Sequence, residues 1–294
     1  MHTGIRLALG TIVKMSVEHP DADEAKRIME LSFQAVQRID DLMNVYRPDS
    51  EIGRLNRQGV CRNVSRDTLE VLKRAIHFST VTGGAFDITV ERGRGNCGAL
   101  KISEEEVLFN EPGMGANLGG IAKGYAVDKA VEVFRANGIE RAIVDAGGDI
   151  KVLGGRTNET GWTIGVRDPR KKKAILSTLQ MRDLAITTSG TYRRDRKDII
   201  HPETLRAVGG IRSSTVFCKD AMDADALSTS IYVMGPEQGL RLIESMEDTG
   251  ALMVTENGDV LKSRLWEDRE SRIREIEKGT QTAREEYSWR QDMV

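Results

Sequence analysis

A pair of adjacent glycines followed by a lysine is the feature of this sequence best suited to hold an anionic ligand. Gly119 and Gly120 precede Lys123, and apolar residues then recur at helical spacing as far as Phe134. Because glycine has no Cβ, the backbone here can approach a bulky ligand closely. A helix that begins at this point would present N–H groups and the positive end of its dipole to a phosphate. A tight turn before a buried helix explains the pattern equally well.

Two familiar phosphate-binding templates do not match this stretch. A P-loop requires Gly-Lys-Ser/Thr in succession, whereas two residues separate Gly120 from Lys123. The dinucleotide fingerprint also fails, because Leu118 stands where a third glycine should follow Gly113 and Gly115. Any phosphate site here is therefore of another kind.

A carboxylate and a hydroxyl four residues apart form the second candidate site. Asp225 and Thr229 lie in a segment whose apolar spacing predicts a helix, so both oxygens would project from one face. Such a pair can bind Mg²⁺ when a carbonyl, waters and a substrate phosphate complete the coordination shell. The alternative is a helix N-cap with an incidental threonine.

Three further places carry polar or aromatic groups that a ligand could use. Asp87 lies in an otherwise apolar segment, and a buried carboxylate there needs a partner. Asp145 and Asp149 flank a Gly-Gly turn, which turn chemistry explains as well as ligand contact does. Tyr46 stands in a polar loop, where it either covers local core or offers a face for a flat heterocycle.

The elements that must position these groups follow from periodicity and turn residues. An amphipathic helix is predicted over 21–43, and a second helix is predicted to begin at a capping box formed by Asp67 and Glu70. The remaining predictions are strands over 7–17, 85–90 and 162–166, and a polar loop over 44–59. Because strands and helices do not alternate as βαβ units, the pattern favours the α+β class.

Composition excludes several classes of function. The chain has 294 residues, 30% of them charged, and a formal net charge of -2, so no basic field predicts nucleic-acid binding. Its three cysteines show no paired spacing, which favours a reducing compartment. With four histidines and no H-E-x-x-H motif, a zinc site is poorly supported. Any metal should be a hard cation bound by oxygen.

The two ends of the chain support predictions about location and domain organisation. No apolar run approaches the roughly 18–20 residues that a membrane span needs, and no signal peptide is visible. We therefore expect a cytoplasmic protein, or a periplasmic or membrane-associated one if a leader was removed. The change to a strongly charged sequence predicts one domain over 1–266 and a charged helical C-terminal extension over 267–294.

Several segments together resemble the ApbE family, the FAD:protein FMN transferases, over about residues 8–266. The resemblance rests on blocks that occur in the family's order: LGT (9–11), TGGAFDITV (82–90), NLGGIAKGYAVDKA (117–130), VDAGGDI (144–150), ITTSGTYRRD…IIHPET (186–204) and the helix that carries Asp225 and Thr229. It implies an α+β fold of mixed, largely antiparallel sheets flanked by helices. It also implies Mg²⁺-dependent transfer of FMN from FAD to a Thr or Ser hydroxyl of an acceptor protein, with release of AMP.

Site residues carried over from this resemblance fall into three groups. The metal would be bound by the carbonyl of Gly120 and the side chains of Asp225 and Thr229. A base near 198–201 would take the proton of the acceptor hydroxyl, and either Asp198 or His201 fills that role. The residues expected to contact FAD are Leu9, Tyr46, Ala85, Phe86, Asp87, Asn117, Lys123 and Ile199.

The chain departs from the family pattern in three respects, at four positions. Asp198 and His201 have exchanged places relative to the usual order, Asn117 replaces a common Asp, and Leu205 replaces a common Gly. These departures affect transfer more than FAD binding. They leave two alternatives to transfer: an FAD-binding or flavin carrier protein, and a Mg²⁺-dependent FAD pyrophosphatase that gives FMN and AMP.

Overall fold

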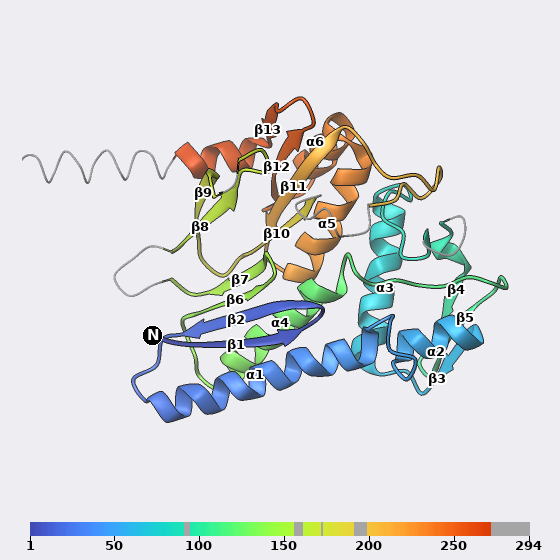
Figure 1. Cartoon of the computed structure of the whole chain (residues 1–294), viewed down its shortest axis with the longest axis horizontal. Coiled ribbons are helices and arrows are strands. Elements are labelled where there is room, and N and C mark those ends of the chain that lie inside the picture. Colours follow the sequence, from blue (N-terminus) through green and yellow to red (C-terminus); the bar gives the residue numbers. More distant parts are fainter. Residues whose placement is uncertain (91–94, 156–160, 172, 191–198, 272–294) are drawn as a thin grey trace, which may run out of the picture.

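An eight-stranded sheet forms the centre of the computed structural model, which describes residues 1–90, 95–155, 161–171, 173–190 and 199–271 (Figure 1). Its strand order is β1-β2-β6-β7-β10-β11-β12-β13, and each neighbouring pair is antiparallel. The strands are β1 (His2–Ala8), β2 (Thr11–Val17), β6 (Ala142–Ala146), β7 (Asp149–Leu153), β10 (Ala185–Gly190), β11 (Ile211–Cys218), β12 (Gly250–Thr255) and β13 (Val260–Lys262). The predicted α+β fold with largely antiparallel sheets is confirmed.

The first two strands correct one prediction. The segment 7–17 is not a single strand, because the chain reverses at Leu9 and Gly10 and pairs Ala8 with Thr11. Both turn residues have positive φ, 54° and 65°. A two-residue hairpin turn with positive φ at both positions matches the right-handed twist of the strands that it joins. The hairpin places the turn at the mouth of the candidate site described below.

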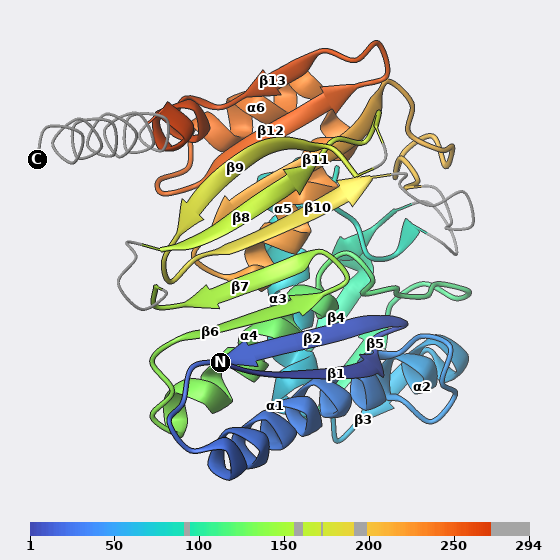
Figure 2. The same ribbon diagram turned by 60° about the vertical axis from the view of Figure 1, so that its left-hand side comes forward.

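Helices cover one face of the sheet (Figures 1 and 2). The predicted first helix is confirmed as α1 (Ala22–Met43), and the Asp21 side chain caps it by accepting from the N–H groups of Asp23 and Glu24. The helices α4 (Ala122–Ala136) and α5 (Ala221–Met234) pack beside it on the central strands. Their apolar side chains form the main core, with Val127, Phe134 and Ile231 fully buried. The face is completed by α3 (Arg66–Val81) and α6 (Pro236–Glu244).

The other face of the sheet is covered over only part of its width. Figure 2 shows the ribbon β8 (Trp162–Arg167) and β9 (Ile175–Met181) crossing in front of β10 and β11. A second apolar cluster lies beneath this ribbon, where the Trp266 ring packs against Phe217 with centroids 5.4 Å apart. The prediction of a strand over 162–166 is thereby confirmed.

A short helix precedes α3, and a small sheet combines one strand from before α3 with two strands from after it. The predicted polar loop over 44–59 contains α2 (Glu51–Gln58), which Ser50 caps by accepting from the Gly53 N–H at 2.8 Å. The strands β3 (Val60–Arg62), β5 (Glu106–Phe109) and β4 (Leu100–Ile102) pair in that order. The polar composition hid this helix, since its buried face is only two turns long.

The start of α3 corrects the predicted capping box. Ser65, not Asp67, is the N-cap and accepts from the Thr68 N–H at 3.2 Å. The Asp67 carboxylate instead accepts from Arg38 and from the Tyr125 hydroxyl. Asp67, together with Glu70, which lies 2.9 Å from the same Tyr125 hydroxyl, thus holds α3 against α1 and α4 rather than capping its end.

The chain ends, in its described part, with a helical turn over 264–271. Glu270 accepts hydrogen bonds from Ser177 at 2.8 Å and from Lys262 at 2.6 Å, so residues on both sides of 266 contact the sheet. The division at 266 stays a prediction, and 272–294 lie outside the described residues. In the described part of the chain, no helix has the length and apolar content to cross a membrane.

Candidate active site

The N-terminus of α4 is the point at which the predicted site segments meet. Gly119 and Gly120 precede the helix as predicted, and Asn137 with Gly138 ends it. A Cβ on Gly124 would lie 2.1 Å from the Ala221 carbonyl oxygen, so α4 and the start of α5 touch backbone to backbone. This close approach brings the side chains of α5 under the first turn of α4.

Gly120 lies directly against the second predicted metal-binding segment. A Cβ at this position would be 3.0 Å from the Thr229 hydroxyl oxygen and 3.4 Å from the Phe86 ring. Asp225, one helical turn before Thr229, accepts from the Gly124 N–H at 3.1 Å through Oδ2. Asp225 therefore caps the first turn of α4, and three segments distant in sequence converge here.

One ammonium group lies between two buried carboxylates at this point. Lys123 donates to Asp149, the first residue of β7, and its Nζ is 3.6 Å from Oδ1 of Asp225. Both carboxylate side chains are 4% exposed, whereas the lysine side chain is 22% exposed. We call Lys123, Asp149 and Asp225 the open cluster. Its three ionised groups sum to a charge of -1.

The electrostatics of the open cluster favour an additional cation. Burial, and after it repulsion by Asp149, raises the pKa of Asp225 above its ordinary value, and Lys123 opposes this only in part. A divalent cation beside Asp225 would remove this excess charge. The site therefore has the electrostatic character of an incomplete cation site.

Hydroxyl groups complete the oxygen-rich surroundings. Ser189, at the end of β10, lies 3.1 Å from the Thr229 hydroxyl and 2.8 Å from that of Ser228. Ser228 in turn donates to the Asp225 carbonyl at 3.0 Å. No role was predicted for Ser189, although it lies in the block ITTSG and ends a run of three hydroxyl residues at 187–189.

The donor set fits a hard cation such as Mg²⁺. Carboxylate, hydroxyl and backbone carbonyl oxygens are the ligands that this ion prefers. Among the residues that the structure describes, no three Asp, Glu, His or Cys side chains converge as metal ligands. Water and substrate phosphate would therefore have to supply much of the coordination, as is usual for Mg²⁺.

A cavity of about 150 Å³ opens beside the open cluster. Four of the predicted FAD contacts line it together with the hairpin turn: Leu9, Tyr46, Asn117 and Lys123. Tyr46 is 76% exposed at its rim. Since ligand pockets commonly measure about 300–1,000 Å³, this volume suits one part of a dinucleotide, with the rest over open surface.

The segment 82–90 corrects another prediction. Ala85 to Val90 form turns rather than a strand, because Gly83 and Gly84 have φ of 61° and 88° and curl the chain. The Asp87 carboxylate has the expected partners, which are the N–H groups of Thr89 at 2.7 Å and Cys97 at 3.0 Å. These local bonds replace the ladder that a strand would have formed.

This curled segment lies next to the first turn of α4. Asn117 donates its N–H to the Ile88 carbonyl at 2.7 Å, and Phe86 is buried against Gly120. Asp87 and Ala85 do not line the cavity, and neither does Ile199, whose carbonyl accepts from Val208 at 2.8 Å. Their roles in FAD binding stay predictions.

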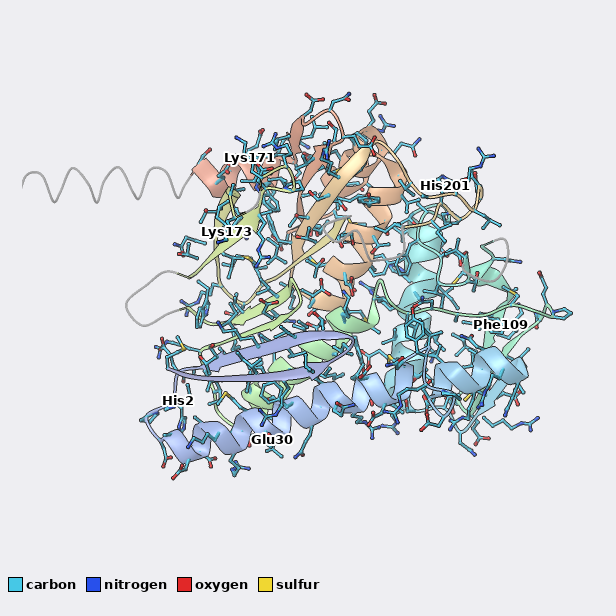
Figure 3. The ribbon with its side chains drawn as sticks, in the orientation of Figure 1. His2, Glu30, Phe109, Lys171, Lys173 and His201 are labelled. Carbon is cyan, nitrogen blue, oxygen red and sulfur yellow. The ribbon has the colours of Figure 1, made fainter. Side chains whose placement is uncertain are left out.

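The two candidate bases lie on the connection between β10 and β11. Asp198 lies outside the described residues. His201 is on a loop beyond the end of the sheet (Figure 3), where its Nδ1 accepts from the Glu203 N–H at 3.2 Å. This contact stays within its own loop.

Comparisons with known proteins agree with the sequence blocks. The ApbE family matches residues 9–95 and 91–253. A protein of Vibrio cholerae and one of Klebsiella pneumoniae, both described as FAD:protein FMN transferase, are 28% and 27% identical to the chain. The alignments cover 84% of this chain and 84% of the V. cholerae protein, and 87% of this chain and 89% of the K. pneumoniae protein.

Solved structures show the same relationship. The structure of the flavin transferase ApbE from V. cholerae superposes with a TM-score of 0.80 at 27% identity, over 91% of this chain and 99% of that one. The ApbE protein of Thermotoga maritima superposes with a TM-score of 0.83 at 27% identity, over 92% and 99%.

Proposed function

The chain belongs to the ApbE family, and on this basis we propose that it transfers FMN from FAD to a Thr or Ser hydroxyl of an acceptor protein. The transfer uses Mg²⁺ and releases AMP. One observation supports the proposal above all others: Gly120, Lys123, Asp225 and Thr229 converge at one helix start, beside a cavity that Tyr46 and Leu9 line. The residues predicted to bind phosphate and those predicted to bind a cation therefore lie at one place.

The residues of the open cluster have distinct roles in this reaction. Asp225, Thr229 and the Gly120 carbonyl would hold Mg²⁺, which would supply charge neutralisation at the pyrophosphate. Lys123 and the first turn of α4 direct positive charge to the same anion. Tyr46 offers an aromatic face to the isoalloxazine ring. These groups thus position the pyrophosphate by charge and the isoalloxazine ring by an aromatic face.

The reaction exchanges a phosphoanhydride bond of FAD for a phosphoester bond to the acceptor. The acceptor oxygen forms a bond to the FMN-side phosphorus, the bond from that phosphorus to the bridging oxygen breaks, and AMP leaves with the bridging oxygen. A base takes the hydroxyl proton as the attack proceeds. We assign this base to the segment 198–201, with Asp198 and His201 as its two candidates.

The proposal is tested with a threonine-bearing acceptor peptide incubated with protein, FAD and Mg²⁺. A mass increase of the peptide by the FMN group, together with AMP, supports transfer. AMP and free FMN with an unmodified peptide would identify a pyrophosphatase. Intact FAD that co-purifies without turnover would identify a flavin-binding or carrier protein. In the same assay, Asp198→Asn and His201→Ala are expected to differ sharply in rate, and near-normal rates for both would exclude this segment as the source of the base.

A further inference from the structure

Asp149 is the member of the open cluster to which no role has yet been assigned. It is the first residue of β7, directly after the Gly147-Gly148 turn, and it is almost fully buried. Its carboxylate accepts from Lys123. A buried carboxylate costs considerable free energy unless it is paired, so its retention at this place calls for a function.

Asp149 and Asp225 compete for the same ammonium group. Lys123 donates to Asp149, whereas its Nζ lies 3.6 Å from Oδ1 of Asp225, a longer ion-pair contact. Asp225 is held from its other side, because Oδ2 accepts from the Gly124 N–H at 3.1 Å. Oδ1 of Asp225 is thus the carboxylate oxygen on which an incoming cation would compete with Lys123.

We infer that Asp149 is a positioning residue that holds Lys123 away from Asp225 and so preserves Asp225 as a cation ligand. The inference rests on the proposed function only in taking Asp225 as a ligand of Mg²⁺. Without the Asp149 charge, Asp225 is the carboxylate of the open cluster that remains for Lys123. The ammonium group then closes onto Asp225 and competes with the metal, because both occupy the same oxygen.

The test measures Mg²⁺ binding by calorimetry on the full chain without FAD, so that catalysis does not enter the readout. Asp149→Asn is expected to weaken Mg²⁺ binding about tenfold or more, as for other residues that orient metal ligands. Adding Lys123→Met removes the competitor and restores the net charge of -1. The double variant is therefore expected to bind Mg²⁺ within about threefold of wild type. Asp149→Glu, which keeps the charge, serves as the conservative control.

Each outcome bears on the inference. If Asp149 were itself a metal ligand or only a structural residue, the double variant would bind as weakly as Asp149→Asn, and that result overturns the inference. Unchanged binding in Asp149→Asn, or no Mg²⁺ binding by wild type, also overturns it. If Asp149→Asn does not fold, the double variant is compared with wild type alone. Mg²⁺ binding within about threefold of wild type then supports the inference, and weaker binding overturns it. Wild type that binds Mg²⁺ but transfers no FMN would refute the proposed function and leave this inference standing.

Discussion

Two lysine–aspartate clusters, built from the same three elements, differ in where their excess negative charge lies. The open cluster has two buried carboxylates on either side of a partly exposed lysine, whereas a second one, which we call the closed cluster, has a buried lysine between the buried Asp128 and the half-exposed Asp220. In each, α4, β7 and the start of α5 contribute one residue: Lys123, Asp149 and Asp225 in the open cluster, and Asp128, Lys151 and Asp220 in the closed cluster. The lysine comes from α4 in the first and from β7 in the second.

The closed cluster satisfies its buried groups completely. Lys151, whose side chain is 5% exposed, donates to Asp128 at 2.6 Å and to Asp220 at 3.1 Å. Asp128 also accepts from the N–H groups of Ala221 and Met222 at 3.0 and 2.9 Å, so it caps α5. Burial lowers and the two carboxylates raise the pKa of Lys151, and the net direction is upward. The pairing therefore outweighs the cost of burying the lysine.

Cavity size does not separate the two regions. The cavity next to the closed cluster measures about 580 Å³ and the cavity beside the open cluster about 150 Å³. In the larger cavity several charged side chains pair with one another, as Arg74 does with Asp223 at 2.7 Å. The comparison teaches that an excess negative charge held on buried carboxylates, rather than cavity volume, marks the place where a ligand is expected.

The largest effect that this comparison predicts is on catalysis, in the open cluster. Asp225→Ala removes a proposed metal ligand and should lower Mg²⁺-dependent FMN transfer by about 100-fold or more. The free energy of unfolding without metal should change little, because the loss of an excess buried charge offsets the loss of the hydrogen bond from the Gly124 N–H. Transfer assays at several Mg²⁺ concentrations and urea denaturation measure the two quantities. Turnover within tenfold of wild type would contradict the assignment.

In the closed cluster, substitution should affect stability instead. Lys151→Met leaves Asp128 buried without its cation and should lower the free energy of unfolding by about 3–5 kcal/mol. FAD affinity of the folded protein should be unchanged. Lys129→Met, which removes the cation of an ion pair with the exposed Glu132, is the matched control and should change unfolding by about 1 kcal/mol or less. Equal losses in the two variants, measured by urea denaturation, would break the comparison.

One aromatic residue near each cluster should show the same difference with smaller effects. Substitution near the open cluster should affect FAD binding, and substitution near the closed cluster should affect stability. Tyr46→Ala at the open rim should raise the FAD dissociation constant about tenfold through loss of one to two kcal/mol of stacking, with little change in stability. Tyr125→Phe removes a buried hydroxyl that donates to Asp67 and Glu70 at 2.9 Å each. It should lower stability by about 1 kcal/mol and leave FAD binding unchanged. Fluorescence titration measures FAD binding, and thermal unfolding measures stability. Lower stability in Tyr46→Ala together with weaker FAD binding in Tyr125→Phe would contradict the prediction.

The ion pair between Asp168 and Arg170, in the turn between β8 and β9, should give the smallest effect, and that effect depends on pH. Hydrogen bonds from Arg170 lower the pKa of Asp168 from 3.8 to about 2. A depressed carboxyl pKa stabilises the folded state above the unfolded value, so this contribution is lost as the pH falls from about 4 to about 2. Asp168→Asn should therefore cost about 0.5–1 kcal/mol at pH 7 and nothing near pH 2. An unfolding difference between variant and wild type that stays constant with pH would contradict this.

Local patterns were sufficient to predict several elements and part of the site. The periodicity of 21–43 predicted α1, and Gly119-Gly120 predicted the start of α4. The spacing of Asp225 and Thr229 predicted two oxygens on one face of a helix. Family-ordered blocks added FAD and the cavity residues Leu9 and Tyr46. These predictions depend on residues near one another in the chain.

Other features depended on contacts that no local pattern contains. The segment 7–17 has the alternation of one strand, yet two positive-φ residues fold it into a hairpin. Asp87 seemed to lie in a strand, but its own carboxylate bonds hold 85–90 in turns. Ser65 displaced Asp67 as the cap of α3, because Asp67 is drawn to Arg38 and Tyr125. In each case a turn or a side-chain hydrogen bond, rather than the sequence pattern used for the prediction, determined the local structure.

The sequence by itself determined the family, the helix that opens with Gly119 and Gly120, and the kinds of side chain available for phosphate and cation binding. Only the tertiary structure decided that Asp149 pairs with Lys123 while Lys151, two residues further along the same strand, pairs with Asp128 and Asp220. The sequence specifies which charged residues are present, but the free energy of a charge depends on its distance from other charges and from water. Those distances are set when α4, β7 and α5 pack together.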